Sequence, residues 1–122
     1  MRINKIEYKN KIFDNYSVII DVRTPLEFKE DHIPGSINLP VLSNIQRHEI
    51  GIQYKENSFF AKKIGAQLIS SNISNIISKI NFEKKEKVLI YCWRGGLRSL
   101  SLYLVLKQIG YEVCLLEGGY KS

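Results

Sequence analysis

The sequence is poor in the residues that cross-link a chain or bind metal ions. Among its 122 residues there are only 2 cysteines and 2 histidines. Cys92 and Cys114 form no C-x-x-C pair, and neither lies near a histidine at the spacing of zinc ligands. We therefore expect no metal site, and in a reducing cytosol we expect no disulfide bond.

Long hydrophobic runs are also absent. No stretch is long enough to cross a bilayer, and residues 1–11 alternate charged with apolar side chains, unlike a signal peptide. We therefore expect a cytoplasmic protein that does not bind membranes. Hydrophobic residues still make up 44% of the chain, which is enough for one core, so residues 1–122 are expected to form a single domain.

Acidic residues are fewer than basic ones, and the formal net charge is +6. A basic balance is compatible with a nucleic-acid partner. The lysines are scattered along the chain, however, so the charge alone favours RNA binding only weakly.

Short β-branched runs alternate with segments of helical spacing along the chain. Strands are predicted at 18–21, 36–39, 88–91 and 113–116. Helices are predicted after Thr24-Pro25, over 60–80 as one helix or two, and over 99–109. This order predicts an α/β fold with a mainly parallel central sheet, flanked by helices on both faces.

The most informative segment joins a predicted strand to a predicted helix. It reads Cys92-Trp93-Arg94-Gly95-Gly96-Leu97-Arg98-Ser99. Open parallel sheets place their sites where a strand ends and a helix begins. The free N–H groups of the helix, the curl that glycines permit and the two arginines all favour a bound anion. We therefore predict that the residues from Trp93 to Ser99 bind an anionic substrate.

Cys92 stands at the mouth of this predicted anion site. Such surroundings favour the thiolate, which is the form that attacks sulfur, selenium or phosphorus. We therefore predict that Cys92 is the catalytic nucleophile. Cys114 has no basic or glycine-rich context and is expected to pack in the core. Trp93 is interpreted either as a stacking platform for a base or an isoprenoid, or as a partly buried side chain, and Ser99 as the N-cap of the helix.

Three further residues are expected to support the site. Asp21 and Arg23 follow a predicted buried strand, where we expect a structural ion pair rather than catalysis. Glu117 begins a Glu-Gly-Gly turn that we expect near the cysteine loop. Tyr54 and Lys55 are expected in a solvated loop, with contact to RNA or to another domain as the alternative.

Two further motifs, taken with the cysteine loop, resemble the rhodanese family. The early motif is Asp21-Val22-Arg23-Thr24-Pro25-Leu26-Glu27-Phe28, followed by HIPGSINLP at 32–40. The late motif is Leu116-Glu117-Gly118-Gly119-Tyr120. The resemblance covers nearly the whole chain. It implies a rhodanese-like fold and the transfer of sulfur through a cysteine persulfide.

A narrower resemblance links the chain to the tRNA 2-selenouridine synthases. It rests on CWRGGLRS at 92–99, on Gly51-Ile52-Gln53-Tyr54-Lys55 and on LEGGYKS at the end. It implies replacement of sulfur by selenium in wobble 2-thiouridine of tRNA, with selenophosphate as the selenium donor and no bound cofactor. That family continues into a P-loop domain, whose GxxxxGK[ST] motif is absent from these 122 residues. We therefore expect a P-loop partner domain, in cis or in trans.

Two other activities stay open. The spacing between Cys92 and Arg98 is C-x5-R, one residue longer than in most rhodaneses. Dual-specificity phosphatases of the same fold have this longer loop, sized for phosphate. A stand-alone thiosulfate sulfurtransferase is the second alternative. A non-catalytic interaction domain is disfavoured because Cys92 is present.

Overall fold

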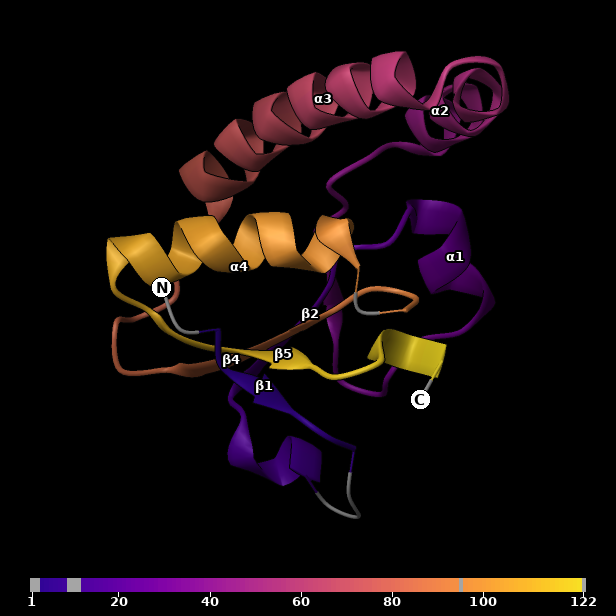
Figure 1. The fold of residues 1–122 in the computed structure, drawn as a ribbon. Coiled ribbons are helices and arrows are strands. Elements are labelled where there is room, and N and C mark those ends of the chain that lie inside the picture. The colour runs from indigo at the N-terminus through magenta and orange to yellow at the C-terminus, as the bar shows by residue number, and fades with distance from the viewer. Residues whose placement is uncertain (1–2, 9–11, 95, 122) are drawn as a thin grey trace.

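Five strands form one sheet in the computed structural model, which describes residues 3–8, 12–94 and 96–121. The sheet order is β1-β5-β4-β2-β3, and every described pairing is parallel (Figure 1). The strands are β1 (Lys5–Ile6), β2 (Val18–Asp21), β3 (Ile37–Asn38), β4 (Lys87–Tyr91) and β5 (Glu112–Leu116). The predicted α/β class and parallel sheet are confirmed.

Four α-helices connect the strands: α1 (Pro25–Glu30), α2 (Asn44–Glu56), α3 (Ser58–Lys79) and α4 (Leu97–Ile109). Helix α1 begins as predicted, because Thr24 and Glu27 form a reciprocal capping box and Pro25 stands at the first helical position. Helix α3 is one unbroken helix, which settles the choice left open for 60–80.

Helix α2 was missed by the sequence analysis. Tyr54 and Lys55 therefore lie on a helix and not in the solvated loop that we expected. The signal was present, because Ser43 and Gln46 form a capping box of the S-x-x-Q type. No side chain of α2 is fully buried, so its apolar residues showed no clear helical stripe.

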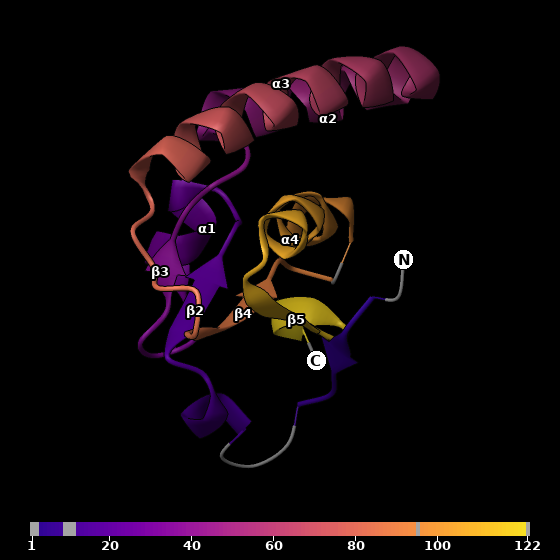
Figure 2. The same cartoon turned by 90° about the vertical axis from the view of Figure 1, so that its left-hand side faces the viewer.

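The two faces of the sheet are covered unequally (Figure 2). Helices α3 and α4 cover one face, and the core beneath them includes Ile20, Ile90, Ile73, Ile76, Leu102 and Leu106. On the other face lie two short 3-10 helices, η1 (Ile12–Asn15) and η2 (Gly119–Lys121), whose Phe13 and Tyr120 pack against the cluster that contains Ile19 and Leu89. The expectation of helices on both faces is thus met on this face by 3-10 helices.

The ends of β2 and β4 lie side by side at one edge of the sheet. Asp21 pairs with Tyr91, so residues 22 and 92 leave the sheet together. The Val22 N–H donates to the Tyr91 carbonyl at 3.1 Å. Behind this edge, Asp21 and Arg23 form the predicted ion pair, with Nη2 of Arg23 2.9 Å from Oδ2 of Asp21. Both side chains are buried, at 0% and 3% exposed.

No helix in the described part of the chain is both long and apolar enough to span a bilayer. Over the same residues, no three His, Cys, Asp or Glu side chains gather in a way that would hold a metal ion.

Asp21→Asn is expected to lower the free energy of unfolding by about 3–5 kcal/mol, because it leaves the buried Arg23 guanidinium without its counter-charge. Urea denaturation followed by circular dichroism measures this change. The matched control is Lys85→Ala, which breaks the ion pair between Lys85 and Glu83. The side chains of these two residues are 85% and 70% exposed, respectively. We expect that control to change stability by less than about 0.5 kcal/mol. Equal effects of the two variants would contradict a structural role for the buried pair.

Candidate active site

Cys92 follows the last residue of β4 directly and is buried, with 2% of its surface exposed. Its sulfur accepts the Gly96 N–H at 3.2 Å and lies 3.1 Å from Oγ of Ser99. The single hydroxyl proton of Ser99 has a second acceptor, the Gly96 carbonyl, also at 3.1 Å. When the sulfur is a thiolate, this proton can turn from the carbonyl to the sulfur. The loop thus offers the thiolate two donors.

Helix α4 begins beside this sulfur without a side-chain cap. Its N-cap is Gly96, so the prediction that Ser99 is the N-cap was wrong. Ser99 lies in the first turn and is buried, and its hydroxyl contacts the Cys92 sulfur and the Gly96 carbonyl. The other three described α-helices are capped by side chains, those of Thr24, Ser43 and Asn57. The first-turn N–H groups of α4 therefore have no side-chain partner at the cap, which suits an anion.

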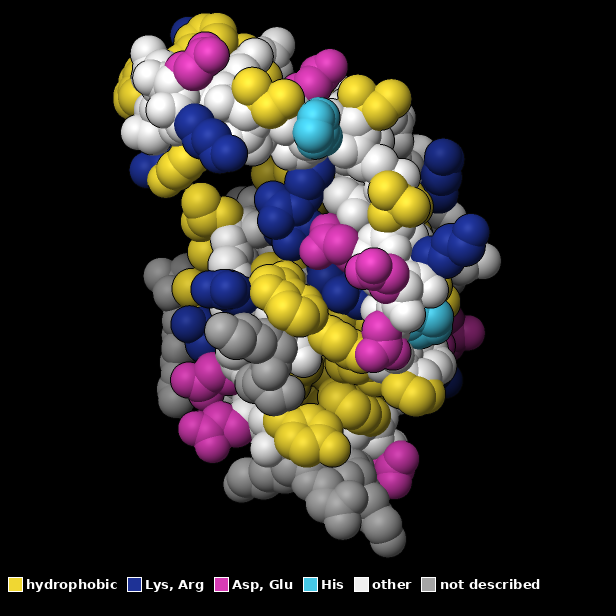
Figure 3. Space-filling model, turned by 90° about the vertical axis from the view of Figure 1, so that its right-hand side faces the viewer, with side chains coloured by type: hydrophobic (Ala, Val, Ile, Leu, Met, Phe, Trp, Pro, Cys, Tyr) yellow, Lys and Arg dark blue, Asp and Glu magenta, His cyan; other side chains and the backbone are white. Residues whose placement is uncertain are grey.

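The other loop residues lie at the surface. Trp93 and Leu97 are 38% and 69% exposed, and Arg94 is exposed as well. Gly95, which we also predicted to bind the anion, lies outside the described residues. Figure 3 shows this end of the molecule, with hydrophobic side chains at its centre and Lys and Arg side chains between them and the helices at the top.

Arg98 forms an ion pair with the carboxylate of Glu27 in α1. Its Nη1 lies 2.9 Å from Oε1 of Glu27, and its Nη2 lies 3.5 Å from Oε2. Burial alone would raise the pKa of Glu27, but Arg98 and the hydrogen bonds of Thr24 outweigh it and lower the pKa to about 2. Arg98 therefore links the start of α4 to α1 through Glu27. Its charge stays beside the N-terminus of α4.

Arg47 of α2 is a site residue that the sequence analysis missed. Its Nε lies 3.7 Å from Oε1 of Glu27. Burial and the neighbouring Arg98 lower the pKa of Arg47, while the charges of Glu27 and Cys92 oppose that shift. Arg47 thus lies within electrostatic reach of the Cys92 sulfur. Only recognition of helix α2 from its capping box could have drawn attention to it.

The end of the chain turns back to the cysteine loop. Glu117 follows β5, and Gly118 and Gly119 have positive φ values of 78° and 66°, which glycine adopts readily. The N–H of Tyr120 then donates to the Cys92 carbonyl at 2.7 Å. The Glu-Gly-Gly turn therefore lies where we predicted it, beside the loop.

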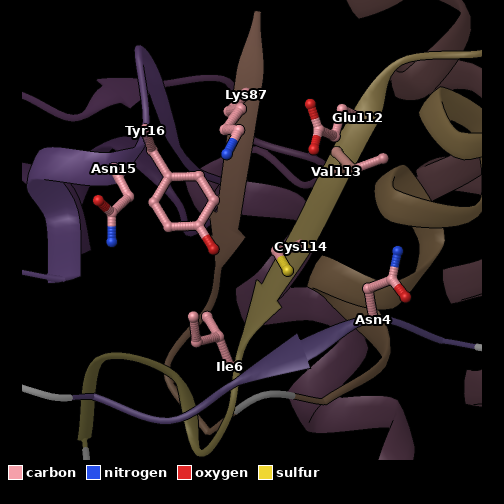
Figure 4. Close-up of a pocket in the computed structure, with 8 residues that line it drawn as sticks. All are labelled: Asn4, Ile6, Asn15, Tyr16, Lys87, Glu112, Val113 and Cys114. Atoms are coloured by element: carbon pink, nitrogen blue, oxygen red, sulfur yellow. The ribbon is translucent and has the colours of Figure 1, made fainter.

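Cys114 lies on the other side of the sheet from α4. It packs against the cluster that contains Leu89 and Leu116, as expected for a core residue, but it remains partly exposed. Figure 4 shows the Tyr16 hydroxyl directed at its sulfur. Burial and the hydrogen bond to Cys114 raise the pKa of Tyr16. The two side chains line a cavity of about 280 Å³ together with Asn4, Ile6, Asn15, Lys87, Glu112 and Val113.

Comparison with known proteins identifies relatives of the whole chain. The family model described as Rhodanese-like domain matches residues 5–122. Two relatives are named tRNA 2-selenouridine synthase. The one from Shewanella halifaxensis is 35% identical over 100% of this chain. The one from Psychromonas ingrahamii is 39% identical over 85% of this chain. The chain spans about a third of the length of these curated relatives, 35% and 29% respectively.

One solved structure is similar over nearly its full length. It is the N-terminal domain of a protein from Clostridium difficile 630, provisionally described as ATP/GTP binding. It is 35% identical with a TM-score of 0.82, and the match covers 97% of this chain and 94% of that one.

Cys92 is expected to react with iodoacetamide at least about tenfold faster than Cys114, because two donors stabilise its thiolate. Exposure alone predicts the reverse order, since Cys92 is buried and Cys114 is not. Timed labelling followed by peptide mapping measures both rates. Labelling in urea, where the two cysteines should react alike, is the control. Faster labelling of Cys114 in the folded protein would contradict the prediction.

Glu27→Gln is expected to flatten the dependence of stability on pH. The folded pKa of about 2 lies below the ordinary value of 4.5, so the ionised carboxylate stabilises the fold above pH 4.5 and this contribution is lost as the pH falls towards 2. Because the side chain is 27% exposed, we expect only about 1–2 kcal/mol at pH 7. Urea midpoints measured between these pH values test this. Glu49→Gln, at an exposed residue, is the control. If wild type and Glu27→Gln lost the same free energy of unfolding between pH 4.5 and 2, the stabilising role of the ionised Glu27 would be refuted.

Proposed function

The chain belongs to the rhodanese-like domain family, and from this membership we propose that it is the chalcogen-transfer domain of a tRNA 2-selenouridine synthase, with Cys92 as the nucleophile. One observation carries the proposal. The sulfur of Cys92 lies between the Gly96 N–H and the Ser99 hydroxyl, at the start of a helix that no side chain caps. In this arrangement two donors can hold the sulfur while the first turn of α4 can hold the oxyanion of its substrate.

The proposed step is a displacement at sulfur. With thiosulfate, the Cys92 thiolate attacks the outer sulfur, a new S–S bond forms, the S–S bond of thiosulfate breaks, and sulfite leaves with the electron pair. The first turn of α4, with Arg98, would hold the sulfonate oxygens during the attack. The product is a Cys92 persulfide, so this half-reaction describes the nucleophile alone, and the selenium of the complete reaction would have to come from selenophosphate. The exchange needs no outside oxidant, and we propose that it uses no cofactor.

The names of the relatives support the tRNA assignment. Because this chain spans about a third of their length, we propose that further chain is needed for the complete reaction. A P-loop partner domain, in cis or in trans, fits the description of the related C. difficile protein as ATP/GTP binding. Selenophosphate carries an oxyanion that the loop would hold in the same way. With tRNA as substrate, the reaction would take place in the cytoplasm.

A phosphatase activity is disfavoured by the acids near the site. A phosphatase of this kind needs a general acid to protonate the leaving oxygen. Glu27 is paired with Arg98 and its pKa is about 2, so it is ionised at neutral pH. Asp21 is buried and accepts hydrogen bonds from Arg23. Transfer through a persulfide makes a smaller demand, because thiolates leave without prior protonation.

Two assays on one preparation test the proposed function. One measures hydrolysis of an aryl phosphate. The other adds the P-loop domain of a relative, 2-thiouridine tRNA and selenophosphate, and detects selenouridine by mass spectrometry. We expect selenation that Cys92→Ala lowers by at least about 10³-fold, and that the matched variant Cys114→Ala preserves. Phosphatase turnover without selenation that depends on Cys92 would overturn the assignment.

A further inference from the structure

Trp93 occupies an unusual place beside the reactive sulfur. It is the only tryptophan in the chain, it follows Cys92 directly, and it is 38% exposed. Leu97 is also exposed at the same loop, so two large apolar side chains lie at the surface beside the exposed Arg94. An exposed indole offers a flat surface to a planar, uncharged group.

One side of the indole is backed by a second aromatic ring. The rings of Trp93 and Tyr120 stack with their centroids 5.9 Å apart and their planes 29° apart. Tyr120 in turn stacks on Tyr91, with centroids 6.0 Å apart and planes at 27°. The backbone of Tyr120 is tied to the cysteine loop by its hydrogen bond to the Cys92 carbonyl. This hydrogen bond joins the segment that carries the stack to the residue before Trp93.

A buried arginine fixes the base of the stack. The guanidinium carbon of Arg23 lies 4.5 Å from the centre of the Tyr120 ring, close enough for a cation–π contact. Arg23 is itself held by the Asp21 carboxylate and by the carbonyl of Asp31, to which Nη2 donates at 2.6 Å. Ordering a stacking surface in advance reduces the entropy lost when a ligand binds.

We propose that Trp93 binds the nucleobase of the acceptor substrate by stacking, and that Tyr120 and Arg23 are positioning residues that hold the indole beside Cys92. The inference rests on the proposed function, in which the acceptor substrate is an RNA. The helix end and the arginines attract the anionic donor, whereas a neutral base gains little from them. Its affinity must come from stacking, which is tolerant of base identity and is worth about 5- to 100-fold in affinity per base.

A double-mutant cycle between protein and RNA tests the proposal. The probe is a short anticodon hairpin with 2-thiouridine at the first anticodon position, compared with the same hairpin carrying an abasic site there. Binding is measured by anisotropy of labelled RNA in the Cys92→Ala background, where no chemistry occurs. Trp93→Leu should weaken binding of the thiouridine hairpin about 5- to 100-fold and leave binding of the abasic hairpin unchanged. Trp93→Phe should retain most of the affinity.

Two controls make the result specific. Phe59→Leu removes an exposed aromatic ring elsewhere, at the start of α3, and should weaken neither hairpin. In the parent protein, tryptophan fluorescence reports on Trp93 alone, and the thiouridine hairpin should quench it more than the abasic one.

The outcomes separate this inference from the proposed function. If Trp93→Leu weakens both hairpins equally, or if neither hairpin changes the fluorescence, Trp93 does not stack on the base and the inference falls. A coupled loss without any Cys92-dependent selenation would refute the proposed reaction and still support the base subsite. Normal selenation with no coupling would refute the subsite alone.

Discussion

The parallel pairing of β4 with a strand on each side is the constraint on which the site depends. Parallel strands end at the same edge, so Cys92 leaves the sheet between the end of β2 and the segment that follows β5. Main-chain hydrogen bonds from Val22 to Tyr91 and from Tyr120 to Cys92 hold the three segments together. The position of the sulfur is therefore set by the main chain, and the side chains of the loop only have to complete its surroundings.

Two arginine–carboxylate pairs then divide the charge around this edge. Arg23 and Asp21 form a buried pair behind the sheet end, where the arginine supports the aromatic stack. Arg98 and Glu27 form the second pair beside the start of α4, with Arg47 next to it. The first pair is structural, whereas the second, taken with Arg47, keeps a net charge of +1 beside the start of α4. The lowered pKa of Glu27 leaves this carboxylate ionised at neutral pH, so it is ill suited to supply a proton.

Patterns within a few residues predicted the fold well, and contacts between distant segments explain what was missed. The buried runs 18–21 and 88–91 and the cap at Thr24 were clear in the sequence because each is local. Strand β1 was not predicted, because its two residues are too few to show the alternation of polar and apolar side chains that is typical of a strand. The start of α4 was misplaced because a serine usually caps a helix, whereas here the sulfur binds its hydroxyl. Glu27 and Arg98 are separated by 71 positions, and no spacing rule links them.

The start of α4 has no side-chain cap, so an anion bound there would also stabilise the fold. In the other three described α-helices a side chain accepts a hydrogen bond from the first turn. In α4 a bound oxyanion would take the place of the cap. Ligand occupancy and conformational stability are then linked, because whatever fills the loop also finishes the helix. A ligand that accepts hydrogen bonds at this helix start would therefore raise the free energy of unfolding of the domain.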